Sequence, residues 1–281
     1  QTEAIAPLDK RLYALRDVTA TVESIPLIVA SILSKKLAEG LSALVMDVKF
    51  GAGAFMEEFE DARRLAKNLS EVGTACGLQM VTYLTSMNSV LGRYAGNALE
   101  MLECAEILRG NLDYSSATLS IKLAASAVHA CYPERSQQEI EQRMSEHLSS
   151  GRALETMAKI VSSQGGDPKF LEDPSTLDKA PVQIPLAATA SGYVTAIDVR
   201  KLGLAIVAMG GGRTRVEDKV DPWVGLSAVK AVGEPVTQGE PLLQIHAADK
   251  RSAEECVNRL QDCFTVQSKQ VQDVLIREIL S

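Results

Sequence analysis

The architecture is set by the stretch ALVMDVKFGAGAF, residues 43–55. Its first eight residues form a short apolar run that ends at glycines, a pattern typical of a buried parallel strand running into a loop. Residues 57–75 favour a helix, and QMVTYL (79–84) favours the next strand. A strand, a helix and a strand in about 40 residues make one unit of an α/β sheet, so the sequence predicts an α/β fold.

Upstream of the first strand, the sequence predicts a helix over 25–38. Ser24 is placed as its N-cap, Pro26 lies in its first turn, and Gly40 follows its end. We expect residues 1–10 to be irregular. The apolar stripe of the helix is predicted to consist of Leu27, Ala30, Leu33 and Leu37. A second face carries Ile28, Ser31 and Lys35.

Downstream, the pattern changes twice. Several helices are expected between 97 and 164, with no strand among them. A segment rich in Pro, Gly and Asp (165–181) then marks a boundary. Beyond it, we expect short strands separated by glycine turns, followed by a closing helix. These strands are predicted within 188–198, 203–212 and 232–247, and the helix within 251–269.

Composition excludes several classes of protein. The net charge is 29 − 36 = −7 and aromatic residues make up 4%, which argues against a broad nucleic-acid or anionic-lipid surface. No apolar run reaches the ~18–20 residues of a membrane span. The five cysteines have no C-x-x-C spacing, so we expect reduced thiols and a cytoplasmic location.

The glycine clusters allow two interpretations each. Neither a Walker A motif nor a G-x-G-x-x-G between a strand and a helix is present. Gly51-Ala52-Gly53 is favoured as a plain strand-to-helix turn, although its bare backbone could approach a ligand. Gly210 to Arg213 could cradle a phosphate, but a turn or bulge between short strands is favoured.

The other chemistry-bearing residues favour structural roles. No G-x-S-x-G elbow is present. Cys256 and Cys263 are interpreted as packing residues of the last helix. The three histidines, which lie far apart and lack a second ligand type at metal spacing, are His129, His147 and His246.

The segment from Tyr13 to Lys35 is more informative. It combines Arg16, Ser31 and Lys35 with the aliphatic Ile28. Two cations and a hydroxyl beside an aliphatic wall suit a flat, neutral ligand that bears carbonyls and an N–H. Solvated surface charges would give the same spacing, and spacing alone does not decide between these interpretations.

A resemblance supplies the missing information. The block DKRLYALRDVTATVESIPLIVASILSKKLAEGLSALVMDVKFGAGAFM (9–56) resembles thymidine phosphorylases and related pyrimidine-nucleoside phosphorylases. The resemblance continues through LTSMNSVLGRYAGNALE (84–100), AIVAMGGGRTR (205–215) and GEPLLQIHA (239–247), and so covers essentially the whole chain. It implies phosphorolysis of a pyrimidine (deoxy)nucleoside: thymidine and phosphate would give thymine and 2-deoxyribose 1-phosphate.

The resemblance also implies site residues. Arg16, Ser31 and Lys35 match the positions that contact the base, with the two cations acting in catalysis. Negative charge develops on the base as its bond to the sugar breaks, and fixed cations would stabilise that charge. The positions that line the base pocket are matched by Tyr13, Val22, Ile28 and Phe55.

No organic cofactor is implied, and inorganic phosphate is the co-substrate. Some family members hold a potassium ion; by position its ligands would be the carbonyls of Leu91 and Tyr94 and the carboxylate of Glu103. The family's Lys-His-Ser stretch and its phosphate-gripping loop have no match here, and the chain begins at Gln1. We therefore interpret the chain as roughly the C-terminal two-thirds of a phosphorylase, and expect it to be nearly inactive without the N-terminal segment, which could be a separate chain.

The implied fold is a small helical lobe and a mixed α/β sheet lobe, with a C-terminal α+β domain resembling a barrel-sandwich. The expected divisions are 1–40 (base site and homodimer interface), 41–165 and 166–281. The expected partners are a pyrimidine nucleoside and phosphate, with neither nucleic acid nor membrane.

Three alternatives stay open. The first is a broader pyrimidine-nucleoside phosphorylase that also uses uridine. The second is an enzyme like anthranilate phosphoribosyltransferase, which would need acidic metal ligands. The third is a non-catalytic fragment or binding module, such as a biotinyl carrier. A carrier would need a modifiable lysine where this chain has Thr237-Gln238-Gly239.

Overall fold

A computed structural model describes residues 7–19, 21, 24–215 and 217–281. Its first sheet is built around β1 (Ala43–Phe50) and β2 (Gln79–Ser86), which pair in parallel from Ala43 opposite Gln79 to Phe50 opposite Ser86. The crossover between them is α3 (Phe59–Ala75). The α/β unit predicted from sequence is therefore confirmed.

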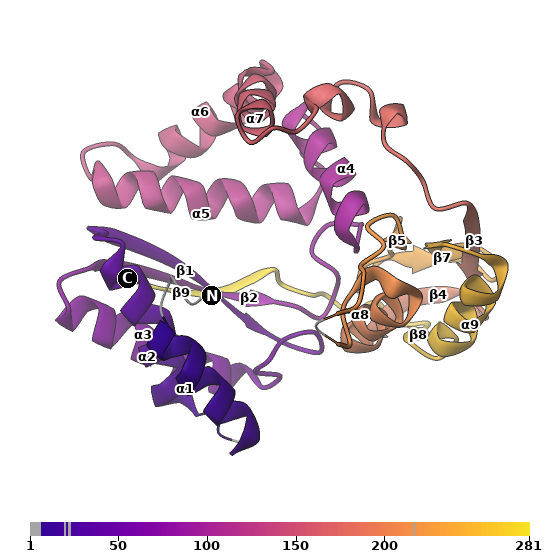
Figure 1. The fold of residues 1–281 in the computed structure, drawn as a ribbon, viewed down its shortest axis with the longest axis horizontal. Helices are drawn as coiled ribbons and strands as arrows, with labels where there is room; N and C mark the ends of the chain where they lie inside the picture. The colour runs from indigo at the N-terminus through magenta and orange to yellow at the C-terminus, as the bar shows by residue number, and fades with distance from the viewer. Residues whose placement is uncertain (1–6, 20, 22–23, 216) are drawn as a thin grey trace.

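The third strand of this sheet comes from the far end of the chain. β9 (Ile276–Leu280) pairs antiparallel with β2, which gives the strand order β1-β2-β9. The sheet is covered on one side by α5 (Ser115–Cys131) and on the other by α3 and α2 (Ile25–Ala38) (Figure 1). No sequence pattern that we identified predicted β9.

The helix predicted over 25–38 is confirmed with the same bounds. Gly40 follows it at φ +73°, and Ser24 is the N-cap residue by backbone position, although its side chain makes no capping hydrogen bond. The predicted stripe is only partly right, because the face that packs against β1 and α3 is centred on Val29 and Leu33. The other predicted stripe residues are exposed, namely Leu27, Ala30 and Leu37.

The N-terminal expectation was partly wrong. Residues 7–10 belong to a helix, α1 (Pro7–Val18), rather than to an irregular segment. Its first turn carries Asp9, a carboxylate in a position that favours a helix start.

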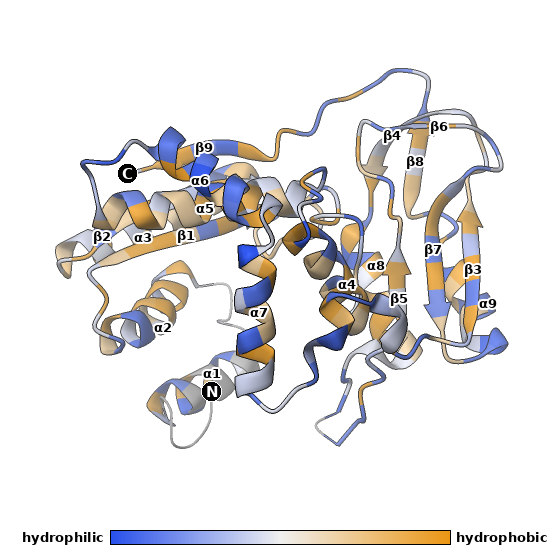
Figure 2. Ribbon diagram, turned by 90° about the horizontal axis from the view of Figure 1, so that it is seen from above, coloured by the Kyte–Doolittle hydropathy of each residue, from blue (hydrophilic) through white to orange (hydrophobic). Residues whose placement is uncertain are grey.

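The helical region predicted between 97 and 164 is confirmed. Figure 2 shows apolar and polar residues alternating along α7 (Arg152–Ser163). The Pro/Gly/Asp-rich segment leads from this region to the C-terminal sheets and contains two short 3-10 turns, Pro168–Leu171 and Pro174–Thr176. The remaining helices of the region are α4 (Asn97–Leu108), α6 (Gln137–Ser149) and α7 (Arg152–Ser163).

The C-terminal part holds two three-stranded sheets, ordered β3-β7-β5 and β6-β4-β8, around a hydrophobic core of their own. The strands are β3 (Val182–Ala187), β4 (Gly192–Ile197), β5 (Gly225–Ser227), β6 (Pro235–Val236), β7 (Pro241–Ala247) and β8 (Phe264–Gln267). The helical elements are α8 (Val199–Ile206), the π-helical turn η3 (Val207–Gly211) and α9 (Lys250–Leu260).

Two predictions in this part were wrong. The apolar run 203–212 is helical, because a buried helix and a buried strand give the same short apolar pattern. The closing helix ends at Leu260, and part of its predicted range forms β8. Cys263 therefore lies between α9 and β8, whereas Cys256 packs within α9; both are buried.

Candidate functional site

The predicted base-contacting residues lie on a pair of antiparallel helices. Asp9 in the first turn of α1 contacts Lys35 in the last turn of α2, whereas Arg16 near the end of α1 reaches the carbonyl of Leu27 near the start of α2. The two helices lie side by side below the first sheet (Figure 1). This pairing places both cations of the prediction on one helix pair, one toward each end.

Lys35 is held by three acceptors. Its ammonium donates to Oδ2 of Asp9 at 2.7 Å, to Oγ of Ser31 at 3.1 Å and to the carbonyl oxygen of Ser31. A lysine ammonium has three N–H donors, so these contacts engage all of them. The Lys35 and Asp9 side chains are 30% and 12% exposed, which places their ion pair at the edge of the solvent.

The carboxylate of Asp9 is stabilised as an anion. The hydrogen bond from Lys35 is the main reason that the pKa of Asp9 lies below its ordinary value, and the hydroxyl of Ser31 and the charge of Arg16 act in the same direction. The sequence analysis did not single out Asp9. Its position in the first turn of a helix was the available signal, but that turn was expected to be irregular.

Arg16 is buried, with 7% of its surface exposed. Its guanidinium donates to the carbonyls of Thr21 at 3.5 Å and Leu27 at 3.4 Å. Both contacts are long, so they orient the side chain more than they stabilise it. Since arginine stays protonated in proteins, Arg16 is a fixed positive charge within electrostatic reach of Asp9.

The predicted pocket-lining residues have different outcomes. Ile28 is half-buried and packs against the core of the first sheet. Phe55 lies in the loop after β1 and is 58% exposed. Val22 and the side chain of Tyr13 lie outside the part of the chain that the structure describes.

The two glycine clusters are local backbone features. Gly51 has φ +104°, and a Cβ there would lie 2.3 Å from Oδ1 of Asn88, which accepts a hydrogen bond from the Ala52 backbone. This close approach supports the turn interpretation. Gly210, at φ +96°, interrupts a helical segment rather than joining two short strands, so that part of the prediction was wrong.

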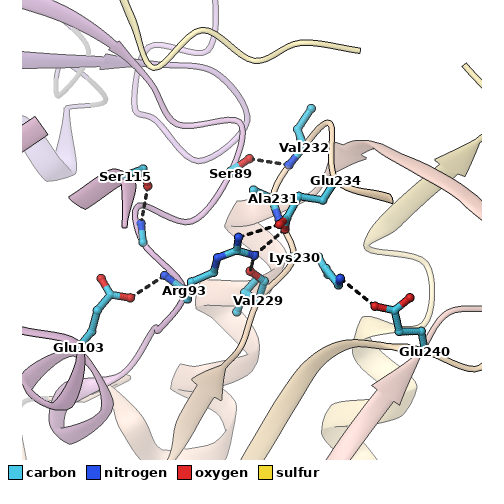
Figure 3. A network of polar contacts seen from close by, with 11 residues as sticks. Ser89, Arg93, Glu103, Ser115, Val229, Lys230, Ala231, Val232, Glu234 and Glu240 are labelled. Carbon is cyan, nitrogen blue, oxygen red and sulfur yellow. Dashed lines mark hydrogen bonds and ion pairs between the residues drawn. The ribbon is translucent and has the colours of Figure 1, made fainter. Parts of the chain in front are cut away.

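Of the proposed potassium ligands, Glu103 and the backbone of Tyr94 are in contact. Glu103 is 5% exposed and accepts hydrogen bonds from the backbone of Arg93 at 2.6 Å, from the backbone of Tyr94 at 3.1 Å and from Oγ of Ser116 at 2.7 Å. Figure 3 shows the hydrogen bond from Arg93 to this carboxylate, and Leu91, Tyr94 and Glu103 line one cavity. Carboxylate and carbonyl oxygens suit a hard cation, so the donor chemistry fits, while the contacts that the structure shows are protein N–H and O–H donors. Among the described residues, no group of three or more His, Cys, Asp or Glu side chains is placed to hold a metal ion.

A bidentate ion pair joins this loop to the C-terminal sheets. Arg93 donates to the two carboxylate oxygens of Glu234 at 2.5 and 2.6 Å, and to the carbonyl of Val229 at 3.3 Å (Figure 3). Burial alone would raise the pKa of Glu234, but the hydrogen bonds from Arg93 and from the Ala231 backbone outweigh it and lower the pKa. These contacts indicate a structural role for Arg93.

A large cavity, which Leu91, Tyr94 and Glu103 help to line, lies apart from the α1–α2 helix pair. It has a volume of about 1000 Å³, lies among α4–α8, and its lining is mainly apolar; none of Arg16, Ser31 and Lys35 contributes to it. Cavity size alone favours this space as a binding site. The α1–α2 helix pair instead offers fixed cations, which suit a ligand or transition state with developing negative charge.

Two of the three histidines make hydrogen-bond contacts with other residues of the chain. Nδ1 of His129 contacts the carbonyl of Arg135 at 2.8 Å, and Nε2 of His246 contacts Oγ of Ser227 at 2.7 Å. Burial lowers the pKa of His246. All five cysteines are free thiols.

Across the described residues, no helix is both long enough and apolar enough to cross a bilayer.

Two family models match the chain. The model described as "Glycosyl transferase family, a/b domain" matches residues 1–154, and the one described as "Pyrimidine nucleoside phosphorylase C-terminal domain" matches residues 193–267.

Curated relatives agree with these matches. The chain is 46% identical over 268 residues to a thymidine phosphorylase of Agrobacterium fabrum, covering 95% of this chain and 61% of the relative. It is 44% identical over 268 residues to a thymidine phosphorylase of Mesorhizobium japonicum, with the same coverage. It is also 44% identical to one of Burkholderia cenocepacia, covering 93% of this chain and 60% of the relative. The chain thus spans about three-fifths of the length of these relatives.

Proposed function

Because the chain belongs to the thymidine phosphorylase and pyrimidine-nucleoside phosphorylase family, we propose that it supplies the base-binding part of an enzyme that phosphorolyses pyrimidine deoxynucleosides. In this reaction a phosphate oxygen bonds to C1′ of thymidine as the bond from C1′ to the base breaks. The products are thymine and 2-deoxyribose 1-phosphate. The observation that carries the proposal is the contact of Lys35 with Ser31 and Asp9, with the charge of Arg16 acting on the same Asp9.

The charge of these residues suits the departing base. Arg16 and Lys35 supply positive charge, and the carboxylate of Asp9 offsets part of it. The base leaves with one negative charge spread over its two carbonyl oxygens. A fixed positive charge therefore binds the transition state more tightly than the neutral substrate, which is the requirement for catalysis.

Each side chain has a role of its own in the proposal. Arg16 would donate to one carbonyl oxygen from a fixed, buried position, and Lys35 would exchange one of its three acceptors for the other carbonyl oxygen. Ser31 can both donate and accept, so it suits the ring N–H beside a carbonyl. A potassium ion held by Leu91, Tyr94 and Glu103 would stabilise the loop at the start of α4, and no step of the reaction passes through it.

A homodimer that works in the cytoplasm completes the proposal. Three exposed leucines on α1, with spacings of four and three residues, form one apolar stripe suited to an interface; they are Leu8, Leu12 and Leu15. Light scattering that gives a monomer mass at micromolar concentration would contradict this part.

The experiment is release of thymine from thymidine, with and without inorganic phosphate. It is done with the chain alone and with added polypeptide covering the part of the relatives that the chain does not match. We expect release only with phosphate, and mainly when the added polypeptide is present, because the phosphate needs a positioned site. Uridine is the second substrate, since comparable release from it would indicate the broader specificity. An absence of thymine release under all conditions would overturn the proposal.

A variant pair tests the residue assignment. Lys35→Ala removes a cation aimed at the base and is expected to lower kcat/KM at least ~10-fold, since one such donor contributes about 3 kcal/mol to transition-state binding. Lys36→Ala is the matched control, because Lys36 is the next residue of α2 and pairs with the exposed Glu39. Near-normal kinetics of Lys35→Ala would contradict the assignment.

A further inference from the structure

We propose that Asp9 is a positioning residue of the base site, whose carboxylate holds the ammonium group of Lys35 beside the hydroxyl of Ser31. The inference rests on the proposed function, because it assigns a task to the contacts of Lys35 in that reaction. It adds a residue for which neither the sequence motif nor the resemblance gave a role.

The geometry supports a holding role. Lysine carries its charge on a flexible four-carbon stem, so a lysine that must meet one atom needs a restraint. Asp9 supplies a charge-assisted hydrogen bond of 2.7 Å, shorter than the 3.1 Å contact of Lys35 with Oγ of Ser31. The Asp9 side chain is the more buried partner, and its own stem is short. The more mobile group is therefore held by the less mobile one.

The carboxylate is itself fixed by the fold. Asp9 is the third residue of α1, and the N-terminal turn of a helix stabilises negative charge. Arg16 lies seven residues further along α1, and its positive charge attracts the same carboxylate. The helix pair thus positions Asp9 first, and Asp9 then positions Lys35.

Asp9 also sets the charge that the ligand meets. With the carboxylate present, part of the positive field of Arg16 and Lys35 is offset. Without it, that field would be stronger, and Lys35 would have lost the acceptor that directs it. We therefore expect loss of Asp9 to impair the chemical step more than the binding of the neutral nucleoside.

The kinetic test uses Asp9→Asn and Asp9→Glu in the assembly that shows phosphate-dependent thymine release. Asparagine keeps the size and removes the charge; we expect kcat to fall ~10-fold or more while KM changes less than about 3-fold. Glutamate restores the charge one methylene further out and is expected to recover most of kcat. In a Lys35→Ala background, Asp9→Asn should have almost no further effect, because the two residues act as a unit. Unchanged kcat in Asp9→Asn, or equal losses in Asn and Glu, would overturn the inference while leaving the proposed function standing.

A second measurement does not depend on activity. The rate at which Lys35 is acetylated by an N-hydroxysuccinimide ester is followed by peptide mass spectrometry in the wild type and in Asp9→Asn. The ion pair shields the ammonium, so we expect labelling of Lys35 to rise several-fold in Asp9→Asn. Glu39→Gln is the matched control, since it releases Lys36 on the same helix and should leave Lys35 unchanged. Equal labelling of Lys35 in Asp9→Asn and the wild type would overturn the inference, even if no phosphorolysis were found.

Discussion

The ion pair between Arg93 and Glu234 gives a quantitative test of how the first sheet is tied to the C-terminal part. Replacing each residue by alanine, singly and together, forms a double-mutant cycle. The pair has two charge-assisted hydrogen bonds of 2.5 and 2.6 Å, and its side chains are 36% and 27% exposed. The ion pair is therefore partly buried, between a fully exposed surface pair and a fully buried one.

The expected coupling energy follows from these contacts. Exposed pairs contribute about 0.2–1 kcal/mol, and a bidentate arginine–carboxylate pair with partial burial should exceed that range. We expect a coupling of about 1–2 kcal/mol. Each single variant should cost about 2–3 kcal/mol, because Arg93→Ala also removes a donor to Val229 and Glu234→Ala removes the acceptor for the Ala231 backbone.

The assay is urea unfolding followed by fluorescence of Trp223, the only tryptophan of the chain, which lies in the C-terminal part. Arg64 and Asp61, an exposed pair on α3, form the control cycle with an expected coupling below about 0.5 kcal/mol. The Arg93–Glu234 coupling should weaken, but persist, in 1 M salt. A coupling no larger than that of the control pair would refute the reasoning.

Two further predictions concern the core and acid stability. Leu33→Ala removes a side chain that is 2% exposed and should cost about 2–5 kcal/mol in urea unfolding, whereas Leu37→Ala on the exposed face of the same helix should cost less than about 1 kcal/mol; similar costs would show that Leu33 is not a core residue. The pKa of Glu234 is lowered from its ordinary value of 4.5 in the folded state, so its stabilisation is fully present above that pH and is lost as the pH falls through the lower folded value. The stability difference between the wild type and Glu234→Gln should therefore be constant near neutrality and shrink below about pH 4.5; a difference that does not change with pH would contradict this sign.

The predictable parts of the fold were those that local chemistry determines. The helix over 25–38 has a proline in its first turn and a glycine after its end, and both signals act within the helix itself. The run 43–50 is apolar and bounded by glycines, so its strand was predictable too. Where local signals are ambiguous, the prediction failed: 203–212 is short and apolar, and whether it forms a strand or a helix is decided by its neighbours.

The pairing of strands that lie far apart in the chain could not be predicted from the sequence alone. β9 joins the first sheet through partners almost 200 residues away, Thr82 opposite Leu280 being one pair, and no local pattern encodes that partner. The same limit applies to the candidate site. Ser31 and Lys35 are one helical turn apart, so their shared face was predictable, whereas the contact of Lys35 with Asp9 depends on how two helices pack.

The two faces of α2 explain how a cation on a flexible stem can be placed accurately. Val29 and Leu33 fix one face of the helix in the core of the first sheet, and Ser31 and Lys35 project from the opposite region of its surface. α1 has exposed leucines on one side and the carboxylate of Asp9 on the side that meets α2. α1 contacts α2 through Asp9 with Lys35 and through Arg16 with the carbonyl of Leu27, so a change at the leucine stripe that moves α1 would also move Asp9. If a second subunit covers the stripe, as proposed, dimer formation and the placement of Lys35 are linked through the same helix, and each should strengthen the other.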